Sequence, residues 1–95
     1  MRPGDYITVN PTEVEVLRSD AFKRVVPDDV AREIRLTAAQ GDPEGYECLS
    51  LPKIGRPVAD ALRRLAATGP STEAVVAEHL AERIEHRLDH RPGAR

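Results

Sequence analysis

The strongest pattern in the sequence is a row of apolar residues, spaced four apart, near the C-terminal end. The residues in this row are Val76, Leu80, Ile84 and Leu88. Because an α-helix has 3.6 residues per turn, steps of four drift by about 40° each, so the row slants across the helix surface. The pattern predicts a long amphipathic helix that is capped by Ser71 and runs to about His90.

The composition limits how well a single chain can cover this row. Of the 95 residues, 40% are hydrophobic but only 3% are aromatic, so the core must be built from aliphatic side chains. A domain of this size buries about 60–65% of the surface of its unfolded chain, which leaves a thin core. We therefore expect the four residues of the row to pack on a second copy as well as on their own chain. This predicts a homodimer formed through the last helix.

Charge and cysteine content exclude or disfavour several classes of protein. The net charge of −2 disfavours binding to a phosphate backbone, and three aromatic residues cannot supply a stacking surface for single strands. No apolar run reaches the 18–20 residues of a membrane span, and residues 1–10 lack the apolar segment of a signal peptide. The single cysteine, Cys48, cannot form an internal disulfide. Together with 12 Arg against 2 Lys, these features predict a cytoplasmic protein of a high-GC bacterium.

Residues 10–13 carry the clearest helix-start signature. Asn10 stands at the cap position, Pro11 at the first helical position and Glu13 at the third, which predicts a helix that begins at Pro11. The apolar spacing extends it to Val26, with a break at Ser19. Residues 13–16 also alternate like a strand that could pair with the β-prone residues 6–9, and the sequence leaves this alternative open.

Three further segments complete the predicted fold. A helix is expected from Asp28 to Gln40, with Val30, Ile34 and Ala38 on its apolar face, and another from Pro57 to Thr68. Residues 41–57 hold three Gly and three Pro, and within them residues 46–51 alternate like a short strand that Pro52 would end. The sequence thus predicts one mostly α-helical domain over residues 1–90, with about four helices, a short strand or hairpin, and a frayed tail at 91–95.

Two possible sites of chemistry lack the partners that they need. His86 and His90 lie one turn apart with Glu82 one turn earlier, but no further cluster completes a metal site. Cys48 has no base or cation nearby in the sequence, so a buried, inert thiol is the favoured interpretation. We therefore predict no metal and no cofactor.

The densest positive group in the sequence consists of Lys53, Arg56, Arg63 and Arg64. Such a group can bind a carboxylate or a phosphate of a partner. The competing interpretation is pairing within the chain, with Asp60 or with acidic residues of the last helix, as exposed helix charges usually do.

The stretch from Tyr46 to Glu85 contains a short strand with Leu49 and Leu51, a helix, a Gly-Pro-Ser turn and a second helix. In this order it resembles the PqqD-like winged-helix modules that recognise leader peptides in ribosomal peptide natural-product pathways. The resemblance covers about 40 of the 95 residues. The chain departs from that family at Ser50, where the family often has Asn, and in residues 11–40, where the family has a β-hairpin.

The resemblance implies a non-catalytic module beside whose sheet a leader peptide adds as a strand. We expect a small accessory protein that binds a peptide or protein partner, encoded in a biosynthetic gene cluster. The expected contact residues are Tyr46, Leu49, Leu51, Lys53, Arg56, Arg63 and Arg64.

Two alternatives from other classes stay open. The first is a small peptide-modifying enzyme, by analogy with the proteins that form lysinoalanine crosslinks in the cinnamycin group of lanthipeptides. Its site would lie at a dimer interface and would use His79, Tyr46 and Arg56. The second is a DNA-binding helix-turn-helix over residues 57–82, which is disfavoured because Glu73 and Glu78 would face the phosphates.

Overall fold

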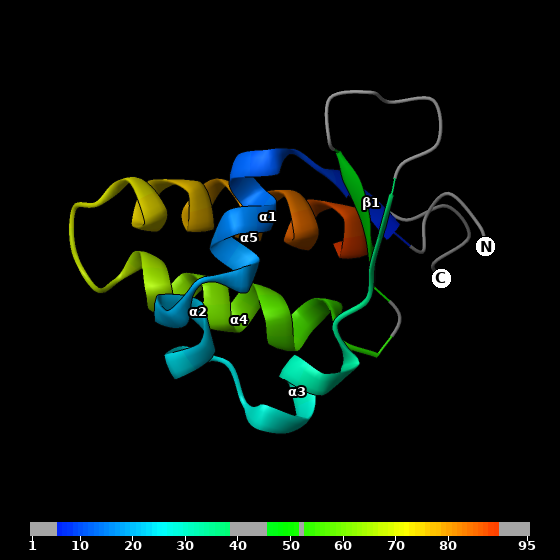
Figure 1. Ribbon diagram of the computed structural model, residues 1–95, viewed down its shortest axis with the longest axis horizontal. Helices are drawn as coiled ribbons and strands as arrows, with labels where there is room; N and C mark the ends of the chain where they lie inside the picture. Colours follow the sequence, from blue (N-terminus) through cyan, green and yellow to red (C-terminus); the bar gives the residue numbers. More distant parts are fainter. Residues whose placement is uncertain (1–5, 39–45, 52, 90–95) are drawn as a thin grey trace.

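The computed structural model describes residues 6–38, 46–51 and 53–89, and this part of the chain forms five helices and a three-stranded sheet (Figure 1). In chain order the elements are β1 (Tyr6–Val9), α1 (Pro11–Arg18), α2 (Asp20–Val25), α3 (Asp28–Glu33), β2 (Leu36–Ala38), β3 (Glu47–Ser50), α4 (Gly55–Ala66) and α5 (Thr72–Asp89). The mostly helical class is confirmed. The sheet has three strands, more than the predicted short strand or hairpin. Gln40, Pro52, His90 and the predicted tail at 91–95 lie outside the described residues.

Side-chain caps define the first two helices. The Asn10 side-chain oxygen accepts from the Glu13 N–H at 2.8 Å, and the Asn10 N–H donates to the Glu13 carboxylate at 2.9 Å. The Ser19 hydroxyl ends α1 by donating to the Val16 carbonyl, and it begins α2 by accepting from the Phe22 N–H. The predicted start at Pro11 and the break at Ser19 are confirmed, and the alternative strand over residues 13–16 is wrong.

The three strands pair antiparallel in the order β1-β3-β2. Ile7 and Leu36 both lie opposite Leu49, so these side chains share the face that packs on the helices. The helix predicted to reach Gln40 ends at Glu33 instead, because residues 36–38 pair with β3. All five helices lie on one side of the sheet (Figure 1).

α4 and α5 form an antiparallel pair, side by side (Figure 1). α4 begins two residues before the predicted Pro57, at Gly55, where a Cβ atom would lie 3.0 Å from a methyl group of Leu88. The Ser71 hydroxyl accepts from the Ala74 N–H at 3.0 Å and caps α5, as predicted. None of the described helices is long and apolar enough to cross a membrane.

The apolar row on α5 is covered by its own chain. Leu80 and Ile84 are 0% exposed, and Val76 and Leu88 pack partly buried against the same core. α4 lies along one side of the row and α1 contacts α5 on another. The chain therefore buries the centre of this row by itself, and only Val76 and Leu88 keep some exposed surface. The homodimer stays a prediction, with less of the row left for a second copy to cover than expected. Val75 is the one large apolar side chain that is exposed among the described residues.

Candidate functional site

Three of the four predicted basic contact residues bind within their own chain. Arg56 contacts Asp89 at 3.2 Å, and Arg63 binds Glu85 through two hydrogen bonds of 3.2 and 2.6 Å. Arg64 donates to the backbone carbonyl of Val25 at the end of α2. For Arg56 and Arg63 the competing interpretation, pairing with acidic residues of the last helix, is the one the structure supports.

The Arg63–Glu85 pair gives a prediction for pH dependence. The hydrogen bond from Arg63 lowers the pKa of the Glu85 carboxyl. A lowered pKa in the folded state adds stability above the pKa of the unfolded chain, and this stability is lost as the pH falls through the folded value. We expect Arg63→Ala to raise the pKa of Glu85, as measured by carboxyl ¹³C NMR titration. The stability difference from wild type should be present at neutral pH and vanish in acid. An unchanged pKa of Glu85 would contradict this account.

The remaining predicted contact residues are dispersed. Leu49 and Leu51 are 0% and 3% exposed, so both are core residues and a partner cannot reach them on the folded surface. Tyr46 is half-buried just before β3. Lys53 is exposed, with a backbone φ of 73°. Tyr46, Leu49 and Leu51 do not form one exposed surface with the paired arginines of α4.

The three residues proposed for catalysis are not brought together. Arg56 pairs with Asp89, ten residues beyond His79 on α5, which corresponds to about 15 Å along the helix axis. Tyr46 precedes β3, whereas Arg56 follows the opposite end of that strand. His79 itself is exposed. A single chain therefore offers no common point at which these three side chains could act.

The other side chains with reactive or metal-binding groups also fail to form a cluster. Within residues 6–38, 46–51 and 53–89, no three His, Cys, Asp or Glu side chains could hold a metal ion together. Cys48 is half-buried rather than buried. It lies on the sheet face opposite the helices, where it lines a cavity of about 260 Å³ with Tyr6, Arg35, Thr37 and Ser50.

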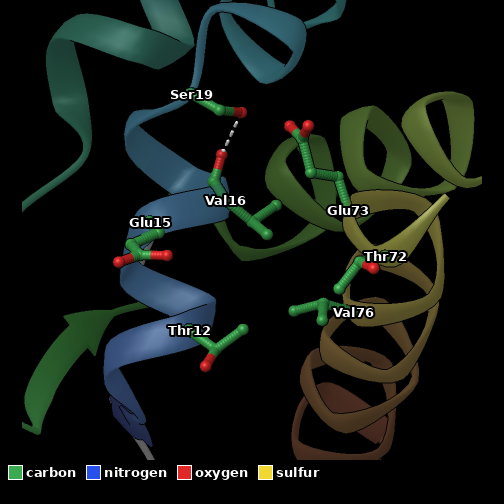
Figure 2. A pocket seen from close by; sticks show the side chains of 7 residues that line it. All are labelled: Thr12, Glu15, Val16, Ser19, Thr72, Glu73 and Val76. Atoms are coloured by element: carbon green, nitrogen blue, oxygen red, sulfur yellow. Dashed lines mark hydrogen bonds between the residues drawn. The ribbon is translucent and has the colours of Figure 1, made fainter.

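A pocket of about 310 Å³ lies between α1 and the first turns of α5 (Figure 2). Val16 and Val76 point toward each other across it, and three hydroxyl side chains contribute to its wall. The Glu15 carboxylate turns away from α5 (Figure 2). It therefore does not converge with Glu73, the other acidic residue of the wall, on one point. The pocket therefore holds no pair of carboxylates that could act together on one substrate.

A second pocket, of about 280 Å³, adjoins the edge of the sheet at β2. We call it the β2 groove, and its lining residues are Leu17, Arg18, Phe22, Lys23, Val26, Ala31, Ile34 and Leu36. Six of these eight side chains are apolar, and the other two are cations. Ala31, Ile34 and Leu36 are only partly buried, so the groove exposes apolar surface. This is the feature of the described surface best suited to hold apolar side chains of a partner.

The backbone beside the β2 groove is open to a further strand. In an antiparallel ladder, both polar groups of a residue point to the same neighbour, alternately to one side and the other. The Ser50 N–H donates to the Arg35 carbonyl at 3.3 Å, so Arg35 and Thr37 face β3. The N–H and the carbonyl of Leu36 must then point outward. No other described strand pairs with β2 on this side.

The opposite edge of the sheet is already in use. On β1 the carbonyl of Thr8 points outward and accepts a hydrogen bond of 2.5 Å from Nη2 of Arg83. The same guanidinium binds Glu13, so α5 covers this part of the edge. At β2, in contrast, no described side chain forms a hydrogen bond with the outward-facing backbone of Leu36.

The β2 groove was not predicted from the sequence. Its walls come from α1, α2, α3 and β2, so no single segment carries a pattern for it. The apolar spacing predicted one helical segment that contains Leu17, Phe22 and Val26. Nothing in that spacing indicates that the edge strand leaves part of this segment open.

The α4–α5 pair does not have the geometry of a DNA-binding helix-turn-helix, whose two helices cross at about 90–120°. Arg56–Asp89 and Arg63–Glu85 join α4 and α5 at two levels, and the helices run antiparallel (Figure 1). Glu73 and Glu78 are exposed on α5, where they would repel phosphates.

Comparison of the chain with models of known families, with curated proteins and with solved structures found no match. The functional argument therefore depends on the geometry of the chain itself. Its strongest element is the β2 groove together with the outward-facing backbone of Leu36.

Proposed function

We propose that the protein is a non-catalytic module that binds an extended peptide segment of a partner protein. One observation carries the proposal: the outward-facing N–H and carbonyl of Leu36 lie beside an apolar groove to which the Leu36 side chain also contributes. Main-chain hydrogen bonds and pockets for alternate side chains are the two elements of peptide binding by strand addition.

The expected binding geometry follows from the pleat of a strand. A segment that pairs with β2 exchanges hydrogen bonds with the polar backbone groups of Leu36. Its side chains then alternate between the two sheet faces, so every second one enters the β2 groove. Ile34 and Ala31 on the far wall would contact these anchoring side chains.

The accessible backbone beside the groove favours a peptide over a small molecule, because it offers main-chain hydrogen bonds to an extended chain. Sheet edges in proteins are commonly protected against pairing with other chains. Arg83 protects β1 in this way by binding the Thr8 carbonyl. An accessible edge next to accessible apolar surface is suited to pairing with a partner.

The sequence resemblance to leader-peptide recognition modules supports the same mode of binding, because those modules also bind a peptide as an added strand. The setting in a peptide natural-product pathway rests on that resemblance alone. The proposed site, however, is the β2 groove, and it includes none of the contact residues expected from the sequence.

The proposal is tested by selecting binders from a random displayed peptide library with the purified protein. We expect enriched peptides whose binding protects the Leu36 amide from hydrogen exchange. Leu36→Pro should abolish binding, because proline removes the outward N–H while an edge strand tolerates it there. Thr37→Val, on the opposite face of β2, serves as the matched control and should bind normally.

Three outcomes would contradict the proposal. One is that no peptide is enriched over protein-free beads. Another is that bound peptides shift NMR signals away from the β2 groove. The third is that Leu36→Pro folds, as judged by its melting curve, and still binds at wild-type affinity.

A further inference from the structure

Both charged residues that line the β2 groove are cations. Arg18 and Lys23 are exposed at its rim, and no carboxylate belongs to its wall. The nearest acidic residues along the chain are exposed but do not line the groove; they include Glu33, Asp20, Asp28 and Asp29. An apolar groove with a positive rim discriminates among partners by charge.

Arg18 keeps most of its hydrogen-bonding capacity. Its Nη2 contacts one oxygen of Glu47 at 3.2 Å, and its side chain is 62% exposed. A guanidinium has five N–H donors, so this one contact leaves donors available for a second carboxylate. The Glu47 side chain is 19% exposed and holds the Arg18 side chain against β3. A ligand carboxylate would therefore meet a guanidinium that is already positioned.

Lys23 adds a second positive charge on the same rim. Its side chain is exposed on α2 and makes no hydrogen bond or ion pair with another described residue. Its ammonium group can reach an acidic group from several directions, because its stem is flexible. Neither rim cation needs to break a buried interaction to bind a ligand.

We propose that the peptide that binds the β2 groove carries a side-chain carboxylate two positions before or after its apolar anchor. This inference rests on the proposed function. Residues two apart on a strand share a face and lie about 6.8 Å apart, so one can fill the groove while the other meets Arg18 and Lys23 at its rim. The proposal specifies a side-chain carboxylate within the segment, as distinct from the carboxylate at the end of a peptide chain.

The test uses the displayed random peptide library at low and at high ionic strength, with C-terminally amidated synthetic peptides for affinity measurements. At low salt we expect Asp or Glu to be enriched two positions from an aliphatic residue. Lys23→Gln should weaken the best acidic peptide about fivefold. Lys23→Glu places a carboxylate opposite Arg18 on the rim and should abolish the acidic preference. Arg24→Gln, with the same charge change outside the groove wall, should alter affinity by less than about twofold.

The outcomes separate this inference from the proposed function. Binders that are lost in Leu36→Pro but show no acidic preference would overturn the inference and leave strand addition standing. Binding that requires a free C-terminal carboxylate would also overturn it, because the charge would then come from the chain end. If no peptide is enriched under any condition, the proposed function itself fails.

Discussion

Replacing Arg83 with leucine is expected to lower the free energy of unfolding by about 3 kcal/mol, because it leaves a buried carboxylate without its counter-charge. Glu13 is 4% exposed, and Nη1 of Arg83 contacts its two oxygens at 2.8 and 2.6 Å. Nη2 also donates to the Thr8 carbonyl, so one side chain joins α5 to α1 and β1. Urea denaturation followed by circular dichroism measures the loss.

Replacing Glu13, the partner of Arg83, should lower the free energy of unfolding by less. Glu13→Gln leaves behind an arginine side chain that is 46% exposed and can be hydrated, and the new amide oxygen can still accept from the Asn10 N–H. We expect a loss of about 1.5 kcal/mol, at the lower end for a hydrogen bond to a charged group. If Glu13→Gln lowers the free energy of unfolding as much as Arg83→Leu, or more, the buried carboxylate is not the cause of the loss in Arg83→Leu. Arg63→Leu, which breaks the more exposed Arg63–Glu85 pair, is the control. It should lower the free energy of unfolding by less than Arg83→Leu does.

Local chemistry was sufficient to predict where most helices begin. Asn10 and Glu13 satisfy each other's backbone groups within four residues, and Ser71 needs only the amide of Ala74. Such caps form with few contacts from elsewhere in the chain, so the sequence pattern and the structure agree. The strand at 6–9 was also suggested by its β-branched residues.

Contacts between distant segments determined where α3 ends and β2 forms, and local patterns did not predict this. Val30, Ile34 and Ala38 are spaced as on a helix, which led to a predicted helix through Gln40. The chain leaves the helix at Glu33 because Leu36–Ala38 gain hydrogen bonds from β3. β-pairing depends on the neighbouring strand far more than on intrinsic preference, so a three-residue strand carries almost no signal of its own.

The row on α5 was predicted correctly in position, but its own chain covers more of it than expected. Because the row slants, different elements can cover its successive parts, and α4 and α1 both contact α5. The thin core was estimated from composition, which contains no information on how densely small residues pack. Ala59, Ala61, Ala77 and Ala81 are all 0% exposed, and such small side chains allow helices to approach closely.

The candidate site shows the same division between local and distant information. Arg56 and Arg63 were identified as positive residues, but their pairing with Asp89 and Glu85 depends on how α4 and α5 align. The β2 groove depends on the sheet order, which leaves β2 at an edge. A lysine such as Lys23 gains a possible role only once its neighbours in space are known.

Phe22→Ala should produce the largest loss of stability, about 4 kcal/mol, because it removes a fully buried aromatic ring and leaves a cavity. Phe22 is the single phenylalanine of the sequence, and it is 0% exposed. It is also the only side chain of α2 that is buried. A helix of six residues does not persist in water without tertiary contacts. We therefore expect faster hydrogen exchange in α2 than the global loss accounts for.

Two control variants show whether Phe22 anchors α2 to the core or only fills space within the core. Phe22→Leu keeps an apolar anchor and should cost about 1.5 kcal/mol without selective exchange in α2. Val30→Ala removes the one buried side chain of α3 and should open that helix instead. If α2 exchanges no faster than the rest of Phe22→Ala, its caps and the hydrogen bond from Arg64 to Val25 are sufficient to hold it. If α2 does open, the wall of the β2 groove is lost with it, so peptide binding should decrease more in Phe22→Ala than in Val30→Ala.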